Sequence, residues 1–129
     1  MALIAGALVA GAFAAPAAAH TKHYPTLVDI DWGIVVDKAA FYGTLGSDLK
    51  SCERDRKVKL FEEVPGRDEF IGSDLSGSLG GDGYEVVTDI PADTLDGTFY
   101  TTVKRKLVTP QKHRHICDPV KSASLGISH

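Results

Sequence analysis

The chain has 129 residues, of which 43% are hydrophobic and 24% are charged, and its formal net charge is -3. This length suits one domain, and the ordinary composition is typical of a globular protein. Acidic and basic residues are interspersed along the sequence, which argues against a protein that binds nucleic acid or anionic membranes through a basic stripe. Asparagine is absent, so there is no acceptor for N-glycosylation.

The first 19 residues carry no charge and consist almost entirely of small and apolar side chains. Residues 2–15 are long enough for the apolar core of a signal peptide but too short to span a bilayer comfortably. Ala17, Ala18 and Ala19 match a signal-peptidase site, so we expect residues 1–19 to be a signal peptide that is cleaved before His20. No Lys or Arg precedes the apolar run. The alternatives to a signal peptide are a buried Ala-rich helix and an uncleaved membrane anchor. If the signal peptide is cleaved, we expect a secreted protein without stable membrane insertion.

The start of the mature chain predicts an N-terminal extension and a first strand over residues 20–38. Residues 20–25 are polar and are expected to be frayed. Residues 26–32 alternate between apolar and acidic side chains, which indicates a strand that joins the main domain and ends at Gly33. Residues 34–37 could continue as a hairpin partner or form an extended connection. Residues 38–45 form the next predicted strand, with Phe41 and Leu45 on one face.

The main domain, over residues 39–129, is predicted to be all-β. Four apolar-alternating runs follow the strand at 38–45, and a closing edge strand ends the chain; they are residues 57–61, 69–73, 83–90, 98–108 and 120–127. The connections carry turn chemistry: Pro65 and Gly66 in one, a Gly-rich loop over 74–83 in another, and a polar loop over 109–119. About seven short strands at this spacing indicate an antiparallel β-sandwich.

The two cysteines, Cys52 and Cys117, are expected to pair if the chain is secreted. The bond would close a long loop, which stabilises a domain by about 4 kcal/mol on the chain-entropy model. Two free thiols are the alternative. Too few further ligands lie near either cysteine to favour a zinc site.

Two loops have side chains that can bind metal ions. Asp74, Ser76, Ser78 and Asp82 offer hard oxygen ligands for calcium, but their spacing is not that of an EF-hand and no Glu closes the loop. His113 and His115 could bind a metal ion or an anion. In both places a solvated loop is the favoured interpretation, so we expect no cofactor.

No catalytic motif marks the chain as an enzyme. The nucleophile-elbow pattern G-x-S-x-G is missing, and no Gly-rich phosphate loop leads into a helix. We therefore expect a non-enzymatic protein.

Several short motifs resemble those of prealbumin-like modules, the group that includes transthyretin-like, carboxypeptidase-regulatory-like and Cna B-type domains. The resemblance covers residues 39–127. The residues that carry it are Gly43-Thr44-Leu45, Cys52, Arg56 to Phe61, Ile71 to Asp74, Gly83 to Val86 and Gly97 to Tyr100. It implies a seven-stranded antiparallel Greek-key β-sandwich that serves as an extracellular structural or binding module. The absence of Asn excludes the Lys–Asn cross-link of some Cna B-type domains.

The leading functional hypothesis is a secreted, non-enzymatic β-sandwich module with a structural or protein-interaction role at or outside the cell surface. Its expected partner is an unknown protein or a surface polymer, and not nucleic acid. The first alternative is a small carrier that binds a ligand or metal through the 74–82 loop or the two histidines. The second alternative is a hydrolase with an unrecognised site.

Overall fold

The computed structural model describes residues 21–78, 80–109 and 114–128, and these form an all-β structure. The predicted signal peptide therefore lies outside the described residues. No helix within the described residues is long and apolar enough to cross a membrane. The strands are β1 (Thr21–Tyr24), β2 (Leu27–Val28), β3 (Asp31–Val35), β4 (Lys38–Gly46), β5 (Lys57–Glu62), β6 (Glu69–Leu75), β7 (Gly83–Pro91), β8 (Gly97–Val103), β9 (Lys106–Val108), β10 (Arg114–Cys117), β11 (Val120–Lys121) and β12 (Leu125–Ile127). Two short 3-10 helices, η1 (Lys50–Cys52) and η2 (Ala92–Thr94), lie in connections.

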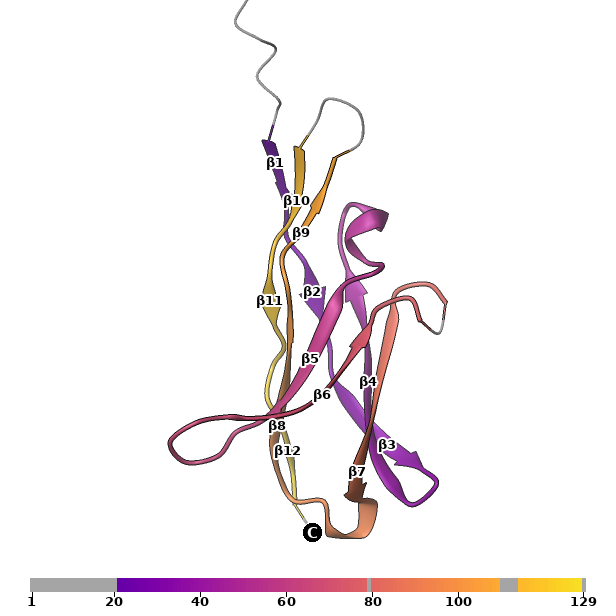
Figure 1. Ribbon diagram of the computed structural model, residues 1–129, viewed down its shortest axis with the longest axis vertical. Helices are drawn as coiled ribbons and strands as arrows, with labels where there is room; N and C mark the ends of the chain where they lie inside the picture. Colours follow the sequence, from indigo (N-terminus) through magenta and orange to yellow (C-terminus); the bar gives the residue numbers. More distant parts are fainter. Residues whose placement is uncertain (1–20, 79, 110–113, 129) are drawn as a thin grey trace, which may run out of the picture.

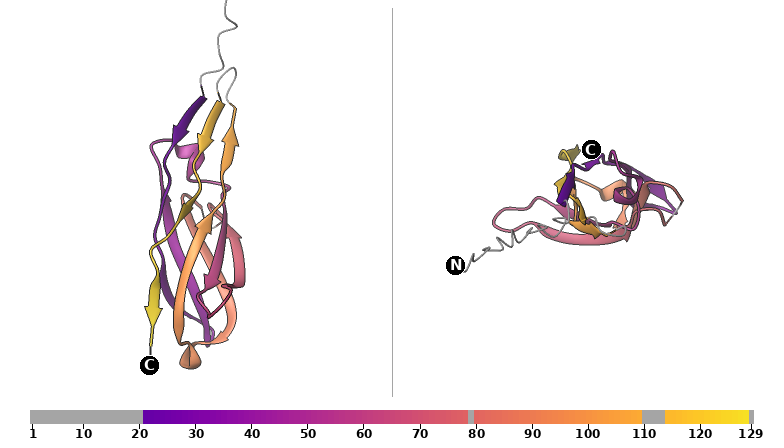
Figure 2. Two further views of the ribbon diagram at one scale, coloured as in Figure 1. Left: turned by 90° about the vertical axis from the view of Figure 1, so that its left-hand side faces the viewer. Right: turned by 90° about the horizontal axis from the view of Figure 1, so that it is seen from above.

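Two sheets face each other to form an elongated sandwich (Figure 1). In the first sheet β4 is central, with β2 and β3 pairing successively along one edge and β7 along the other. The second sheet has the order β6–β5–β8, and β11 and β12 both pair with the free edge of β8. A third sheet, β1–β10–β9, extends beyond one end of the sandwich, and the β3–β4 turn and η2 lie at the opposite end (Figures 1 and 2).

The core lies between the two large sheets and follows the predicted alternation of side chains. Alternate residues of one strand point to the same face of a sheet, and in each central strand one of the two sets is buried. The core consists of Ala39, Phe41, Leu45, Val58, Leu60, Tyr84, Val86, Leu95, Phe99, Val103 and Ile127. The inward faces predicted for the central strands are therefore confirmed. The run predicted at 98–108, however, is two strands, because β8 pairs with β5 in the second sheet and β9 pairs with β10 in the third. The closing strand predicted at 120–127 is likewise divided into β11 and β12.

The predicted ends of several elements are wrong. The segment expected to be frayed contains β1, which pairs in parallel with β10, and β10 lies in the expected 109–119 loop. β1 pairs with a strand at the other end of the chain, which local patterns cannot reveal, and β10 lies between β1 and β9. Strand β6 extends to Leu75, into the predicted Gly-rich loop. Gly33 does not end a strand but lies within β3.

The break in the first strand lies instead at Asp29, between β2 and β3. Its carboxylate accepts hydrogen bonds from the Thr44 backbone N–H (2.7 Å) and from the Thr44 hydroxyl (3.2 Å). The Tyr84 hydroxyl donates to the Asp29 carbonyl at 2.6 Å. A Cβ atom on Gly43 would lie 2.3 Å from that same carbonyl oxygen. A glycine is therefore needed where the bent strand crosses β4.

Candidate functional site

The turn between β3 and β4 exposes a continuous run of apolar side chains. Ile34 is 64% exposed, Val35 is 38% exposed and Val36 is 87% exposed. We call residues 34–37 the hairpin tip. In a soluble protein three consecutive exposed apolar residues are a fault unless they serve a function.

The backbone of the hairpin tip is strained at its most exposed residue. Val36 and Asp37 have φ angles of 47° and 67°, which is the sign pattern of a two-residue type I′ turn. Such turns favour Asn-Gly or Asp-Gly, because both central residues need positive φ. Asp tolerates this conformation, but a β-branched residue in it is an outlier. The fold thus keeps Val36 in an unfavourable backbone conformation, although its exposed side chain adds almost nothing to the core.

An open cavity of about 550 Å³ lies beside the hairpin tip. Its apolar wall consists of Trp32, Ile34, Pro91 and Ala92, and its polar groups belong to Asp37, Lys38 and Asp93. A volume of roughly 300–1,000 Å³ with a mostly apolar lining and a few polar groups is typical of ligand-binding pockets.

The cavity lies between the β3–β4 hairpin and the segment around η2, and both are held in place by the sandwich. Trp32 lies opposite Phe41 in the β3–β4 register and packs against the core while its remaining surface lines the cavity. The Ala92 N–H donates a hydrogen bond to the Asp37 carbonyl at 2.9 Å, which ties the hairpin tip to η2. The cavity is therefore fixed by the fold rather than formed by two independent loops.

The cavity carries an excess of negative charge. Asp37 and Asp93 each contribute a carboxylate, and Lys38 contributes one ammonium group. Within the described part of the chain, neither carboxylate forms an ion pair. Ionised carboxylates only accept hydrogen bonds, so these two groups can bind donors such as hydroxyl, guanidinium or ammonium groups.

The predicted disulfide between Cys52 and Cys117 is confirmed, and it lies toward the end of the sandwich opposite the hairpin tip. The two residues are 65 positions apart and both are fully buried. Closing a loop of this length stabilises the fold by about 4 kcal/mol on the chain-entropy model.

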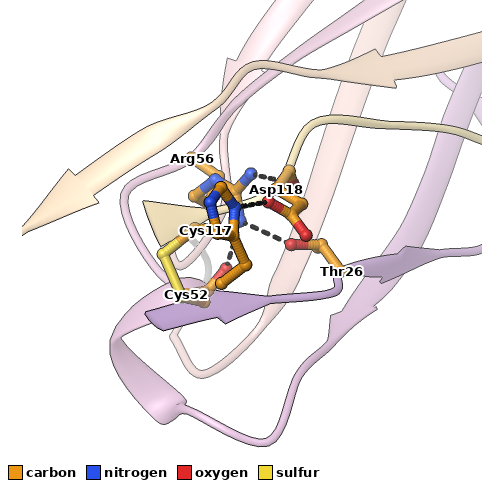
Figure 3. Close-up of polar contacts among 6 residues, drawn as sticks. Thr26, Cys52, Arg56, Cys117 and Asp118 are labelled. Carbon is orange, nitrogen blue, oxygen red and sulfur yellow. Dashed lines mark hydrogen bonds and ion pairs between the residues drawn. A yellow bond between two sulfur atoms is a disulfide. The ribbon is translucent and has the colours of Figure 1, made fainter. Parts of the chain in front are cut away.

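Arg56 is buried beside the disulfide (Figure 3). Every N–H group of its guanidinium donates a hydrogen bond. It donates two hydrogen bonds to the Lys104 carbonyl and one each to the Cys52 carbonyl, the Thr26 hydroxyl and the Asp118 carbonyl, at 2.7–3.1 Å. Burial lowers the pKa of Arg56, and the negative charge of Asp118 opposes this shift. The contacts join four segments of the chain, so the arrangement is that of a structural clamp.

The predicted calcium loop uses several of its oxygen atoms within the fold. Asp74 Oδ2 accepts hydrogen bonds from the Ser78 hydroxyl (2.8 Å) and the Glu85 N–H (2.9 Å). Ser76 is fully buried and its hydroxyl accepts the Arg56 backbone N–H at 2.9 Å. The Asp82 carbonyl accepts the Leu45 N–H at 3.0 Å. The described residues contain no group of three or more acidic, His or Cys side chains that could hold a metal ion.

The predicted histidine pair can be placed only in part. His113 lies outside the described residues, whereas His115 lies in β10 and its ring contacts Tyr24, with ring centroids 5.2 Å apart. His115 thus packs within the third sheet.

Sequence reasoning missed both the cavity and the Arg56 clamp. The available signal for the hairpin tip was Ile34-Val35-Val36-Asp37 itself, three β-branched residues at a strand end with neither Gly nor Asn to make the turn. Arg56 carried no such signal, because a charged residue before a strand usually faces water.

No protein-family model, curated protein or solved structure shows significant similarity to this chain.

Proposed function

We propose that this protein is a secreted, non-enzymatic β-sandwich module that binds another protein at or outside the cell surface. The observation that carries the proposal is the hairpin tip, whose exposed apolar side chains have no role in the core. Exposed apolar surface that the fold does not need is typical of interaction sites. Backbone strain at Val36, the most exposed of these residues, supports a functional origin, because such strain persists mainly at functional sites.

The disulfide supports the secreted location in this proposal. Disulfides persist in oxidising compartments and are rare in reducing ones. The bond is fully buried, and the carbonyl of Cys52 accepts a hydrogen bond from Arg56, so the disulfide belongs to the folded scaffold. An apolar leader at residues 1–19 would provide the route of export.

We also propose that the strands follow seven paths in a Greek-key sandwich of the prealbumin-like type. Three paths combine consecutive segments, namely β1–β3, β8–β9 and β10–β12, and β4, β5, β6 and β7 are the other four. The positions of the family-like motifs support this: Val58 to Phe61 lie in β5, Gly83-Tyr84 begin β7 and Gly97-Thr98 begin β8.

The proposal is tested by affinity capture from the surface fraction of the producing cells, with the purified secreted protein as bait. A variant with Ile34→Ser and Val36→Thr removes apolar surface from the hairpin tip. A matched control with Leu75→Ser and Val87→Ser removes apolar surface elsewhere, because Leu75 and Val87 are each 51% exposed. We expect a protein that the wild type and the control both capture and that the tip variant loses. Equal capture by all three baits, or capture of no protein, would contradict the proposal.

A further inference from the structure

The cavity beside the hairpin tip has the chemistry of a site for a cationic side chain. Trp32 lines the cavity, and tryptophan is the side chain that best attracts a cation to its ring face. Asp37 and Asp93 add two carboxylates on the same cavity, against the single ammonium group of Lys38. We propose that this cavity binds a lysine or arginine side chain of the protein that docks on the hairpin tip. The inference rests on the proposed function and specifies its partner.

The apolar run next to the cavity decides between a free cation and a protein segment. A small cation would leave the side chains of Ile34 and Val36 in water, where they are 64% and 87% exposed. A protein segment can cover them with apolar residues and place a basic residue in the cavity at the same time. The expected partner surface therefore has a basic residue beside an apolar patch.

The charge of the cavity also separates a protein partner from an anionic membrane. Apolar hairpin tips can insert into lipid, but anionic headgroups attract basic residues near the surface. Here two of the three charged groups that line the cavity are carboxylates. Electrostatic complementarity thus favours a basic protein surface.

The site is also ready-formed, which lowers the cost of binding. Trp32 is held by the core and the Asp37 backbone is held by Ala92. Side chains that are already ordered lose little entropy when the partner binds.

Trp32 is the only tryptophan in the chain, so its fluorescence reports directly on the cavity. The experiment selects 12-residue peptides from a phage-displayed library on the purified secreted protein. Selected peptides are then synthesised and titrated while Trp32 fluorescence is followed. We expect them to contain Lys or Arg next to apolar residues, to change the fluorescence, and to bind more weakly as salt is raised.

Two double variants separate the role of the cavity from general electrostatics. Asp37→Asn with Asp93→Asn removes both carboxylates, and Asn tolerates the positive φ of residue 37. Asp48→Asn with Asp55→Asn removes the same charge outside the cavity, and residue 55 also has a positive φ of 53°. We expect the cavity variant to bind about tenfold more weakly, because it loses both carboxylates that can pair with the basic side chain. The control variant should bind within about twofold of the wild type.

Three outcomes would overturn the inference. Peptides that lack basic residues, or that bind the cavity variant as tightly as the wild type, would refute the cationic site while leaving a tip-dependent protein interaction intact. Absence of any enriched peptide over a blank surface would refute the cationic site and count against the proposed function too. A change of Trp32 fluorescence with phosphatidylserine-containing vesicles, but not with peptides, would assign the tip to a membrane.

Discussion

Replacing Val36 by Asn should make the protein more stable while it weakens binding. Val36 has a φ angle of 47° and its side chain is 87% exposed. The substitution therefore removes almost no buried apolar surface. It places at the turn one of the residues that type I′ turns prefer.

The size of the effect follows from the backbone conformation. The left-handed region costs an L-residue roughly 1–2 kcal/mol, and β-branched residues tolerate it least. Asn adopts this region several-fold more often than most residues, so we expect it to recover about 1 kcal/mol. For a domain of about 100 residues this raises the melting temperature by about 4–8 °C.

Urea unfolding followed by circular dichroism measures this gain. The midpoint should rise with an unchanged slope, because the surface exposed on unfolding stays the same. Val36→Thr is the matched control: it keeps the β-branch and the strain but replaces a methyl group by a hydroxyl. We expect no gain in stability from Thr and weaker partner binding from both variants.

A midpoint for Val36→Asn at or below that of the wild type would refute the idea that the turn stores strain. An equal gain for Val36→Thr would show that the exposed methyl group, and not the φ angle, is responsible. If stability rises and binding is unchanged, the strain has no connection with partner recognition.

Three further predictions concern the scaffold. Arg56→Lys replaces five N–H donors by three, so at least one of the four acceptors is left unpaired. The free energy of unfolding, measured in urea, should fall by about 2 kcal/mol. A fall below ~0.5 kcal/mol would contradict the role of Arg56 as a clamp. Gly43→Ala places a Cβ atom 2.3 Å from the Asp29 carbonyl oxygen, so it should lower the free energy of unfolding by about 1–3 kcal/mol. Gly126→Ala is the control: its Cβ position has open space around it, so the free energy of unfolding should hardly change. Burial raises the pKa of Tyr84 to about 12. Because this pKa is above the ordinary value of about 10, the neutral Tyr84 hydroxyl contributes fully to folding stability below pH 10, and this contribution is lost as the pH rises toward 12. Tyr84→Phe should therefore make the free energy of unfolding less dependent on pH between about 10 and 12. An unchanged pH dependence would contradict the raised pKa of Tyr84.

The central strands could be predicted from the sequence because their signal is local. Val58 and Leu60 alternate with lysines, and Phe99 and Val103 lie on one face of their strand, so the buried face was evident from spacing alone. The disulfide followed from cysteine count and the expected export. These features need no knowledge of which strand lies beside which.

The remaining features depend on contacts between distant segments. β1 exists because β10 lies beside it, and the two are more than 80 residues apart in the chain. Arg56 is buried because acceptors from four segments meet around it. The cavity forms because η2 lies against the hairpin tip. None of these contacts leaves a periodic pattern in the sequence.

Site-specific photo-crosslinking on the producing cells tests most directly whether the hairpin tip is the binding surface. A photoreactive residue at position 36 reports on the tip, and one at position 75, which is also exposed in the native protein, is the control. We expect a discrete crosslinked protein from position 36 and none from position 75. Equal crosslinking at both positions, or no crosslinked protein from position 36, would contradict a specific interaction at the tip.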